Sequence, residues 1–257
     1  MVSDVRIIGL KGFPLVKPGD DIARLMVVRA RFLRIRIAHG DIFVVGHKIV
    51  SKSEGRIATL SGVEPSTRAV KLARRCRKDP RLVHLILSES RRVIKAKPGI
   101  LLVETKGGIV CLNAGIDKSN VEGSNAYCLL PKNPKRSATR IARRILEEAG
   151  KRVRVIITDT YSRPFRTGQS EFAIGLSGLN PFVDYRGSKD LFGNVLRFKR
   201  VSIADELASA AELVMGQGDE GVPVAIIKGA NRILKSNKGA SSRLTMRKDR
   251  DLFKGAV

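Results

Sequence analysis

The sequence lacks several features that define common classes of protein. It has no tryptophan, and aromatic residues make up only 5% of the chain. It is therefore poor in the ring surfaces on which single-stranded nucleic acids stack their bases. No run of about 18 apolar residues occurs, which argues against a membrane-spanning helix. The first 13 residues have no apolar core of a signal peptide, so we expect a cytoplasmic protein.

Cysteine and histidine are also scarce, with three of each: Cys76, Cys111 and Cys128, and His39, His47 and His84. The cysteines are too few and too far apart for a disulfide framework or a cysteine-based zinc site. We expect reduced, partly buried thiols instead. The histidines form no HExxH motif or other metal-binding spacing, so each is expected to be a surface or packing residue.

Positive charge is the strongest signal in the composition. The chain has 49 lysines and arginines against 24 acidic residues, a formal net charge of +25. Such a charge attracts polyanions, among them nucleic acid, anionic lipid and nucleotides. Most basic residues nevertheless fall in helical stretches such as 68–78 and 135–151, where a charged face is usually exposed to solvent. Nucleic-acid binding therefore stays open as an alternative, argued from charge alone.

Periodicity and turn signals predict a mixed α+β fold, with mixed or antiparallel sheets and helices. Strands are predicted at residues 5–13, 40–52, 151–160, 170–178, 194–204 and 222–229, with a hairpin about Lys106–Gly107–Gly108. Helices are predicted to begin after Asp20, Ser66, Asp79 and Ser137, with further helices at 204–216 and near Met246–Phe253. We interpret 1–257 as a single module, and the segment 131–137, rich in proline and lysine, as the best candidate for a subdomain boundary.

Three segments that look buried end in polar clusters, at 113–120, 158–160 and 216–221. Their carboxylate, amide and hydroxyl oxygens are the donors that Mg²⁺ and Mn²⁺ prefer. Their glycines let backbone N–H groups approach phosphate closely, and lysines such as Lys48 and Lys52 can offset phosphate charge. Asp and Asn after a strand are also ordinary turn formers. Three such clusters on a basic chain nevertheless favour a shared site for a divalent cation and a triphosphate.

One of these clusters imitates a known fingerprint. Residues 216–221, GQGDEG, fit the pattern GxGxxG. A dinucleotide site requires a strand before the glycines and a helix after them, because the helix N-terminus receives the pyrophosphate. Here a predicted helix comes first and a strand follows, so the order of elements argues against a Rossmann cofactor site. The chain also lacks GxxxxGK[ST], so the triphosphate site is not a Walker P-loop.

The motifs together resemble a known family. NAGIDKSN (113–120), IITDTYSRPFRTGQ (156–169), FAIGLSGLNPFVDYRGSKDLFGNVL (172–196), ADELASAAELVMGQGDEGVPVAIIKG (204–229) and KSEGR (52–56) are similar to motifs of the coenzyme F420:L-glutamate ligases, or γ-glutamyl ligases. The likeness runs in order from residue 9 to residue 253.

This resemblance implies a GTP-dependent ligase. Such an enzyme attaches L-glutamate to the lactyl carboxylate of the deazaflavin coenzyme precursor and extends the tail through γ-linked bonds, with GDP and phosphate as products. It implies Mg²⁺ or Mn²⁺, two ions by expectation, and a response to K⁺. It also implies a fold of two subdomains that intertwines as a homodimer. Some relatives carry a further C-terminal redox domain, which we do not expect here.

Matching the family's motifs residue by residue implies a set of site residues. The metal shell is implied to be Asp117, Asp159, Thr160 and Gln217. The GTP contacts are implied to be Phe13, Pro14, Leu15, Val16, His47, Lys48, Lys52, Asn120, Met215, Gly216, Gln217, Gly218, Asp219, Glu220, Gly221 and Val222.

The chain departs from the family pattern at a few positions. His47 and Lys48 stand where relatives often carry Ser-Thr. The preference for GTP over ATP is therefore left open. Ser162 and Phe165 replace an expected Gly and Trp, and Lys228 replaces Arg. The excess positive charge either steers anionic substrates or is a solvated surface. Two further alternatives are a related ligase with a different acyl acceptor and a metal- and nucleotide-binding regulator without turnover.

Overall fold

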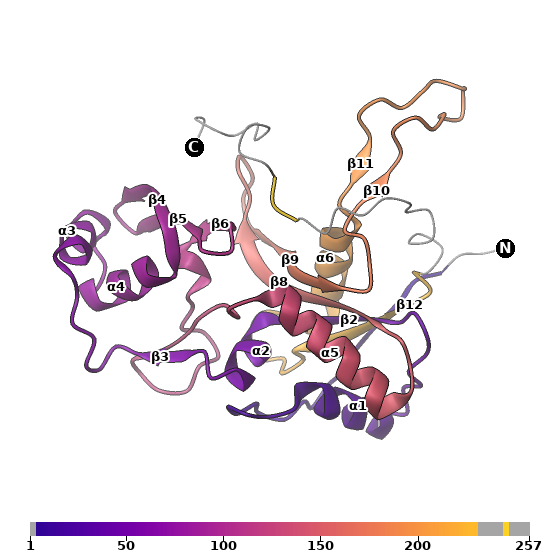
Figure 1. Ribbon diagram of the computed structural model, residues 1–257, viewed down its shortest axis with the longest axis horizontal. Coiled ribbons are helices and arrows are strands. Elements are labelled where there is room, and N and C mark those ends of the chain that lie inside the picture. The colour runs from indigo at the N-terminus through magenta and orange to yellow at the C-terminus, as the bar shows by residue number, and fades with distance from the viewer. Residues whose placement is uncertain (1–3, 231–243, 247–257) are drawn as a thin grey trace.

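A computed structural model describes residues 4–230 and 244–246 of the chain. Within them, helices and strands mix along the sequence and form several separate sheets, which confirms the predicted α+β class (Figure 1). The last predicted helix falls outside the described residues apart from Met246. No helix in 4–230 or 244–246 has the length and apolar character needed to cross a membrane.

A five-stranded sheet forms the centre of the molecule. Its strands lie in the order β1 (Arg6–Gly9), β12 (Val224–Lys228), β2 (Ile42–Gly46), β8 (Arg154–Ser162) and β9 (Gln169–Ser177). β2 and β8 run parallel, and the other neighbouring strands are antiparallel. The inner strands are continuous apolar runs because both faces of the sheet are covered.

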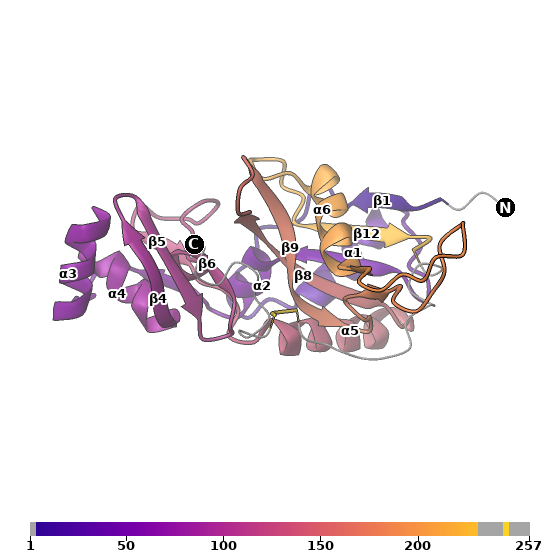
Figure 2. The same ribbon diagram turned by 90° about the horizontal axis from the view of Figure 1, so that it is seen from above.

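Helices pack on the two faces of this sheet. α1 (Ile22–Phe32) and α5 (Pro134–Ala149) cover one face, and α6 (Ile203–Met215) covers the other (Figures 1 and 2). Successive strand residues point to opposite faces. Accordingly, Phe43 packs in the core on the α1 and α5 side, whereas Ile42 and Val44 pack on the α6 side.

A second group of elements lies at one end of the molecule (Figure 2). It contains α3 (Thr67–Cys76), α4 (Pro80–Glu89), β4 (Ser90–Lys97), β5 (Ile100–Thr105) and β6 (Val110–Leu112). The two helices cover one face of the β4–β5–β6 sheet, around a core that includes Leu101 and Val103. β3 (Ile57–Thr59) pairs with β7 (Ala126–Cys128), and these two strands connect the group to the central sheet. The segment 131–137 joins β7 to α5 and includes the first turn of that helix.

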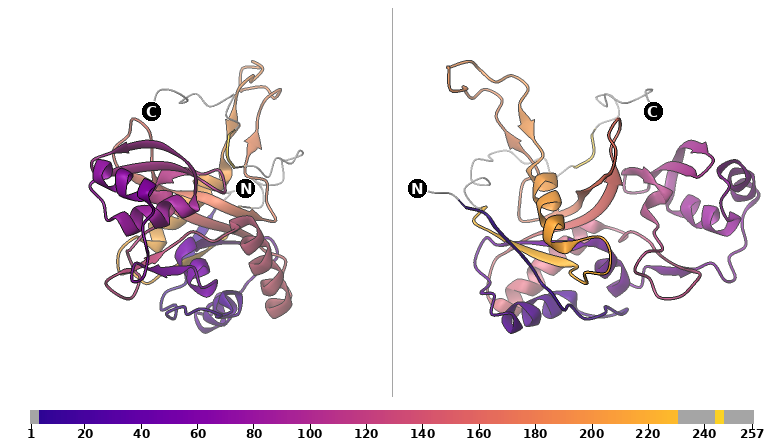
Figure 3. Two further views of the ribbon diagram at one scale, coloured as in Figure 1. Left: turned by 60° about the vertical axis from the view of Figure 1, so that its left-hand side comes forward. Right: turned by 180° about the vertical axis from the view of Figure 1, so that it is seen from behind.

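Residues 185–199 form an arm that projects from the body between β10 (Val183–Asp184) and β11 (Arg200–Val201) (Figures 1 and 3). The strand predicted at 194–204 is therefore wrong except at 200–201. Beyond β10 and β11 the two limbs of the arm make only scattered main-chain contacts, such as the bridge between Lys189 and Val195, and an isolated two-stranded ribbon is marginal without further packing.

Two other predictions were wrong at element boundaries. The strand predicted at 40–52 ends at Gly46, and helix α2 (His47–Ser53) follows at once. Both parts are apolar and largely buried, so their periodicity does not reveal the change. The cap of α5 is Asn133, not Ser137, because the Asn133 side chain accepts a hydrogen bond from Arg136 N and Pro134 occupies the first turn. Ser137 is instead buried and donates to Glu54.

The remaining helix starts agree with the sequence or differ by one residue. Ser66 and Asp79 cap α3 and α4 as predicted, and Gly150 ends α5 in the left-handed conformation. The cap of α1 is Asp21 rather than Asp20: Asp21 accepts from Arg24 N, while Asp20 accepts from Lys17 N in the preceding turn.

Asp21 joins two helices as well as capping one. Its Oδ2 accepts hydrogen bonds from Arg144 of α5, at 3.0 Å from Nε and 2.7 Å from Nη2. Partial burial opposes ionisation of this carboxyl, but the bonds from Arg144 and Arg24 outweigh it and lower the pKa of Asp21. Because the pKa is lowered on folding, the stabilisation is present above the ordinary pKa of Asp and is lost as the pH falls through the folded value.

We predict that Asp21→Ala lowers the free energy of unfolding by about 1–2 kcal/mol, since it removes both the cap and the ion pair. Asp21→Asn is the matched control. It retains a good cap and loses only the charge, so its loss is about 1 kcal/mol or less. Urea unfolding at neutral pH measures both values. Equal losses in the two variants would show that the cap contributes nothing.

Candidate active site

The sequence-predicted residues line one open cavity of about 2210 Å³. The cavity lies against the ends of β2 and β8, helix α2, the 113–120 segment, the loop after α6 and the β4–β5–β6 sheet. All residues predicted for the metal shell and for GTP are among its lining residues, including the segment Phe13–Val16 that precedes α1. Single-ligand pockets usually measure about 300–1,000 Å³. This cavity therefore has room for more than one substrate.

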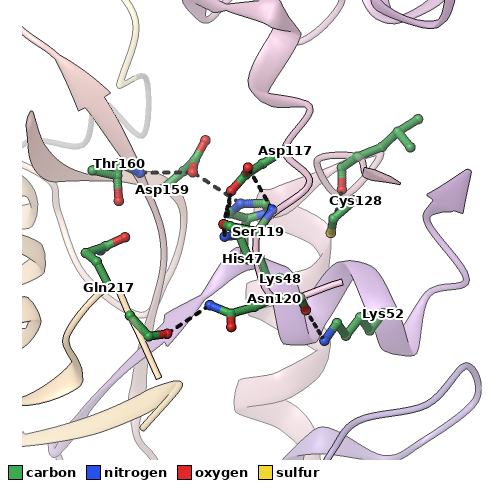
Figure 4. A network of polar contacts seen from close by, with 12 residues as sticks. His47, Lys48, Lys52, Asp117, Ser119, Asn120, Cys128, Asp159, Thr160 and Gln217 are labelled. Carbon is green, nitrogen blue, oxygen red and sulfur yellow. Dashed lines mark hydrogen bonds and ion pairs between the residues drawn. The ribbon is translucent and has the colours of Figure 1, made fainter. Parts of the chain in front are cut away.

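Helix α2 supplies three of these side chains. It begins immediately after β2, so His47 and Lys48 stand at the end of a central strand. Lys48 Nζ lies 2.6 Å from Asp117 Oδ2 and also contacts the Ser119 hydroxyl. One turn later, Lys52 Nζ donates to the main-chain oxygen of Asn120 at 2.7 Å. The spacing of four residues places both amines on one face of the helix, toward the 117–120 loop (Figure 4).

The two predicted aspartates meet at this helix. Asp117 is held by main-chain hydrogen bonds to Cys128 of β7, and Asp159 lies in β8. His47 Nε2 lies 3.1 Å from Asp159 Oδ1, so adjacent residues of α2 contact the two carboxylates (Figure 4). The structure thus brings together two acids that are far apart in the sequence.

The environment of Asp117 favours its charged form. Burial opposes ionisation, but hydrogen bonds from Lys48 and from the Ser119 hydroxyl and N–H outweigh it and lower the pKa of Asp117 to about 2. His47 is 3% exposed, and neither of its ring nitrogens makes a hydrogen bond of good geometry. Asn113 Oδ1, on the same cavity wall, is also buried without a hydrogen-bond partner. The site therefore holds buried polar atoms whose bonding capacity is not used.

The loop after α6 closes another side of the cavity. Asn120 has a left-handed backbone, with φ of 55°, and its Nδ2 donates to Gly218 O at 3.1 Å. Gly216 has φ of 69°, and a Cβ there would lie 2.2 Å from the carboxyl carbon of Glu220. The backbone conformation requires glycine at residue 216, whereas the Glu220 carboxylate is the end of a flexible side chain that can move aside. The loop follows a helix and precedes β12, which confirms that GQGDEG is not a Rossmann fingerprint.

Sequence reasoning missed one residue of this site, Glu171. It lies in β9, is 4% exposed, and lines the same cavity. Its Oε2 accepts hydrogen bonds from Thr160 Oγ1 at 2.6 Å and from Gln217 Nε2 at 3.2 Å. Burial raises the pKa of Glu171 above its ordinary value. The only signal in the sequence is a single acid at the start of an otherwise apolar strand, SEFAIGLS.

The predicted metal shell contains two carboxylates, a hydroxyl and an amide oxygen. No group of three His, Cys, Asp or Glu residues suited to a metal occurs within 4–230 or 244–246. This is compatible with Mg²⁺, which is usually bound by one or two carboxylates together with waters and substrate phosphates. The oxygen donors Asp117 and Asp159, with Thr160 and Gln217 on the same cavity, therefore fit a hard divalent cation.

Comparison with known proteins identifies the family of the chain. A sequence model of the family "F420-0:Gamma-glutamyl ligase" matches residues 11–229. The chain is 44% identical to the Coenzyme F420:L-glutamate ligase of Methanothermobacter thermautotrophicus over 98% of this chain and 99% of that protein. It is 43% identical to the protein of the same name from Methanopyrus kandleri, over 93% of each chain. The relative from Archaeoglobus fulgidus is 45% identical over 88% of each chain. The chain belongs to the F420-0:gamma-glutamyl ligase family.

Proposed function

We propose that the protein is a GTP-dependent ligase that adds L-glutamate to the glutamate-free coenzyme F420 precursor and extends it through γ-linked bonds. The observation that carries this proposal is the convergence of the family's implied metal and nucleotide residues, from separate segments of the chain, on one cavity. The names of the relatives support the substrate class.

The reaction proceeds through an acyl phosphate, because a free carboxylate is a poor acyl donor. An oxygen of the lactyl carboxylate attacks the γ-phosphorus of GTP, and the bond from that phosphorus to the β–γ bridging oxygen breaks, releasing GDP. The amine of glutamate then attacks the acyl carbon and forms the amide. Inorganic phosphate leaves, and the amine gives up a proton to solvent.

The side chains on the cavity wall have separate tasks in this scheme. Lys48 and Lys52 offset phosphate charge, and the 216–221 loop positions the nucleotide through its main chain. Asp117 and Asp159, with Thr160 and Gln217, would hold Mg²⁺ or Mn²⁺, which neutralises charge on the phosphate oxygens when bound. Asp117 is suited to this task because its lowered pKa keeps it ionised.

We predict that wild-type protein with GTP, Mn²⁺, L-glutamate and the precursor gives a mass spectrum with a ladder of glutamate-sized additions. Asp117→Asn should reduce GDP release that depends on both precursor and glutamate by about a hundredfold, as expected for a loss of about 2.7 kcal/mol of charge stabilisation. Asp79→Asn is the matched control, since Asn also caps α4 and residue 79 does not line the cavity.

The two parts of this experiment fail separately. Absence of the ladder with wild-type protein would overturn the ligase, whereas a ladder formed at a normal rate by Asp117→Asn would remove only the role of Asp117. Replacing the precursor by another carboxylic acid tests the alternative of a different acyl acceptor. Replacing GTP by ATP tests the nucleotide preference that His47 leaves open.

We also propose where the deazaflavin precursor binds. The face of the β4–β5–β6 sheet that turns away from α3 and α4 lines the cavity with apolar side chains: Ile94, Ile100, Leu102, Val110 and Leu112. Leu102 and Leu112 stand directly opposite each other, and Lys95 pairs with Leu102 on the other side. An apolar wall with an exposed amine at its edge suits a flat aromatic ring with an anionic phosphodiester tail. The wall is continuous with the triphosphate end, as the reaction requires.

Leu112, 40% exposed, is the test position on this wall. We predict that Leu112→Ser raises KM for the precursor about tenfold and leaves KM for GTP unchanged, since it removes roughly 1.5 kcal/mol of apolar contact. The control is Leu213→Ser on α6, which changes an 85% exposed leucine outside the cavity. An unchanged KM for the precursor in Leu112→Ser would place the ring elsewhere.

The projecting arm supports the proposal of a homodimer. Leu191, Phe192 and Phe198 are 100%, 91% and 90% exposed in the single chain. Large apolar side chains grouped in this way mark an interaction surface. A second copy of the chain is the occupant that the family resemblance implies, and an arm that reaches across to a partner is the geometry of an intertwined dimer.

We predict that the wild-type protein has twice the mass of one 28.1 kDa chain in solution. The double variant Phe192→Ser/Phe198→Ser should be monomeric, because two aromatic side chains each contribute about 2 kcal/mol when buried. Light scattering after size-exclusion chromatography measures both masses. Leu213→Ser again serves as the control for an exposed apolar residue, and a dimer that survives the double variant would exclude the arm as its interface.

The first of two further expectations rests on the resemblance alone. We propose that K⁺ supports the activity, which the same assay tests when choline replaces K⁺ at equal ionic strength. We propose a cytoplasmic enzyme, because GTP and glutamate are cytoplasmic metabolites.

A further inference from the structure

Thr160 and Gln217, two residues of the proposed metal shell, donate hydrogen bonds to the same carboxylate oxygen, Oε2 of Glu171. Thr160 and Glu171 are direct partners in the antiparallel pairing of β8 with β9. A register shift between Ile157 and Thr158 sets this pairing, because β9 has one extra residue opposite that point. Directly paired residues have side chains on the same side of a sheet. Thr160 and Glu171 therefore meet at the edge of the cavity, where the loop after α6 brings Gln217 to the same carboxylate.

The hydrogen bonds to Glu171 determine which atoms Thr160 and Gln217 can offer. The hydroxyl proton of Thr160 is committed to Glu171 Oε2, so the oxygen lone pairs are left for another ligand. The Gln217 amide donates through Nε2 to the same oxygen, so its carbonyl Oε1 points away from Glu171. A threonine or glutamine without such an acceptor is free to turn its donor outward, and a donor repels a cation.

Resting on the proposed function, we propose that Glu171 is a positioning residue for the divalent cation. Its carboxylate holds Thr160 and Gln217 in the orientation that presents their oxygens to the metal. Outer groups of this kind fix the first ligands of many metal sites, and their loss typically weakens metal binding by about tenfold to a hundredfold. The role belongs to the acceptor oxygen of Glu171 and not to a direct bond from its carboxylate to the metal.

The experiment measures Mn²⁺ affinity by electron paramagnetic resonance, with GTP present and without precursor or glutamate, so that no turnover is required. Glu171→Leu removes the acceptor at similar volume, and we expect the dissociation constant of Mn²⁺ to rise by about tenfold to a hundredfold. Glu171→Gln keeps an acceptor oxygen for both donors. We expect it to stay within about threefold of wild type, because orientation and not charge is the property at issue.

Ser209→Ala is the matched control for disturbance of this buried region. The Ser209 hydroxyl donates to the main-chain oxygen of Glu171 at 2.9 Å and does not contact its carboxylate. Its loss should leave Mn²⁺ affinity unchanged. Thermal unfolding of every variant establishes that the folded protein is being titrated, and Glu171→Ala replaces Glu171→Leu if the leucine variant does not fold.

The outcomes separate this proposal from the ligase itself. Wild-type affinity in Glu171→Leu overturns the positioning role. Equal losses in Glu171→Leu and Glu171→Gln also overturn it, because they assign the effect to the charge of Glu171. Wild-type protein that binds no Mn²⁺ with GTP overturns the proposed metal-dependent function as well. A final check uses the Thr160→Ala/Gln217→Ala background, in which Glu171→Leu should add nothing further if it acts through these two residues.

Discussion

Three carboxylates, Asp117, Asp159 and Glu171, line one cavity, and holding acidic groups there is the constraint that the surrounding structure must meet. A carboxylate from which water is partly excluded is costly to ionise unless a donor or a positive charge lies beside it. Each carboxylate has a neighbour that donates to it: Lys48 to Asp117, the Thr160 main-chain N–H to Asp159, and the Thr160 and Gln217 side chains to Glu171. The site thus gathers acidic groups in one place. Such a cluster can attract a divalent cation even though the chain as a whole is positively charged.

The fold brings these residues together because the parallel strands β2 and β8 end at the same edge of the central sheet. β2 and β8 are parallel and adjacent, so His47 and Asp159 follow from neighbouring strand ends. The β4–β5–β6 group contributes no ion pair to the carboxylates, but its uncovered face continues the cavity away from them. Charge lies at one end and apolar surface at the other. This division matches the proposed reaction between a triphosphate and a carboxylate attached to a flat ring.

The sequence was sufficient for the parts that depend on local chemistry. Ser66, Asp79 and Gly150 mark helix ends because caps and left-handed positions need particular residues. The polar clusters also predicted a shared site, since Asp117 and Asp159 follow apolar runs whose ends were visible. What motif matching added was the assignment of single residues, and the structure places these residues on one cavity wall.

The remaining features were set by contacts that a single sequence does not display. The change from strand to helix at Gly46 is hidden in a buried apolar run. Asn133 and Ser137 are both plausible caps, and the contact of Ser137 with Glu54 decides between them. Glu171 reaches the site only because a register shift pairs it with Thr160 and because a loop 46 residues away brings Gln217 to its carboxylate. Each error therefore lies where tertiary packing, rather than local preference, selects the outcome.

Helix α2 also restricts how this protein family can change in evolution. Lys48 and Lys52 reach the same loop because they are one turn apart, and each residue added to a helix turns the next side chain by about 100°. A single insertion or deletion between them would carry one amine away from the loop. Ile49, Val50 and Ser51 between them are buried, so packing limits their substitution while the helix turn fixes the length of the segment.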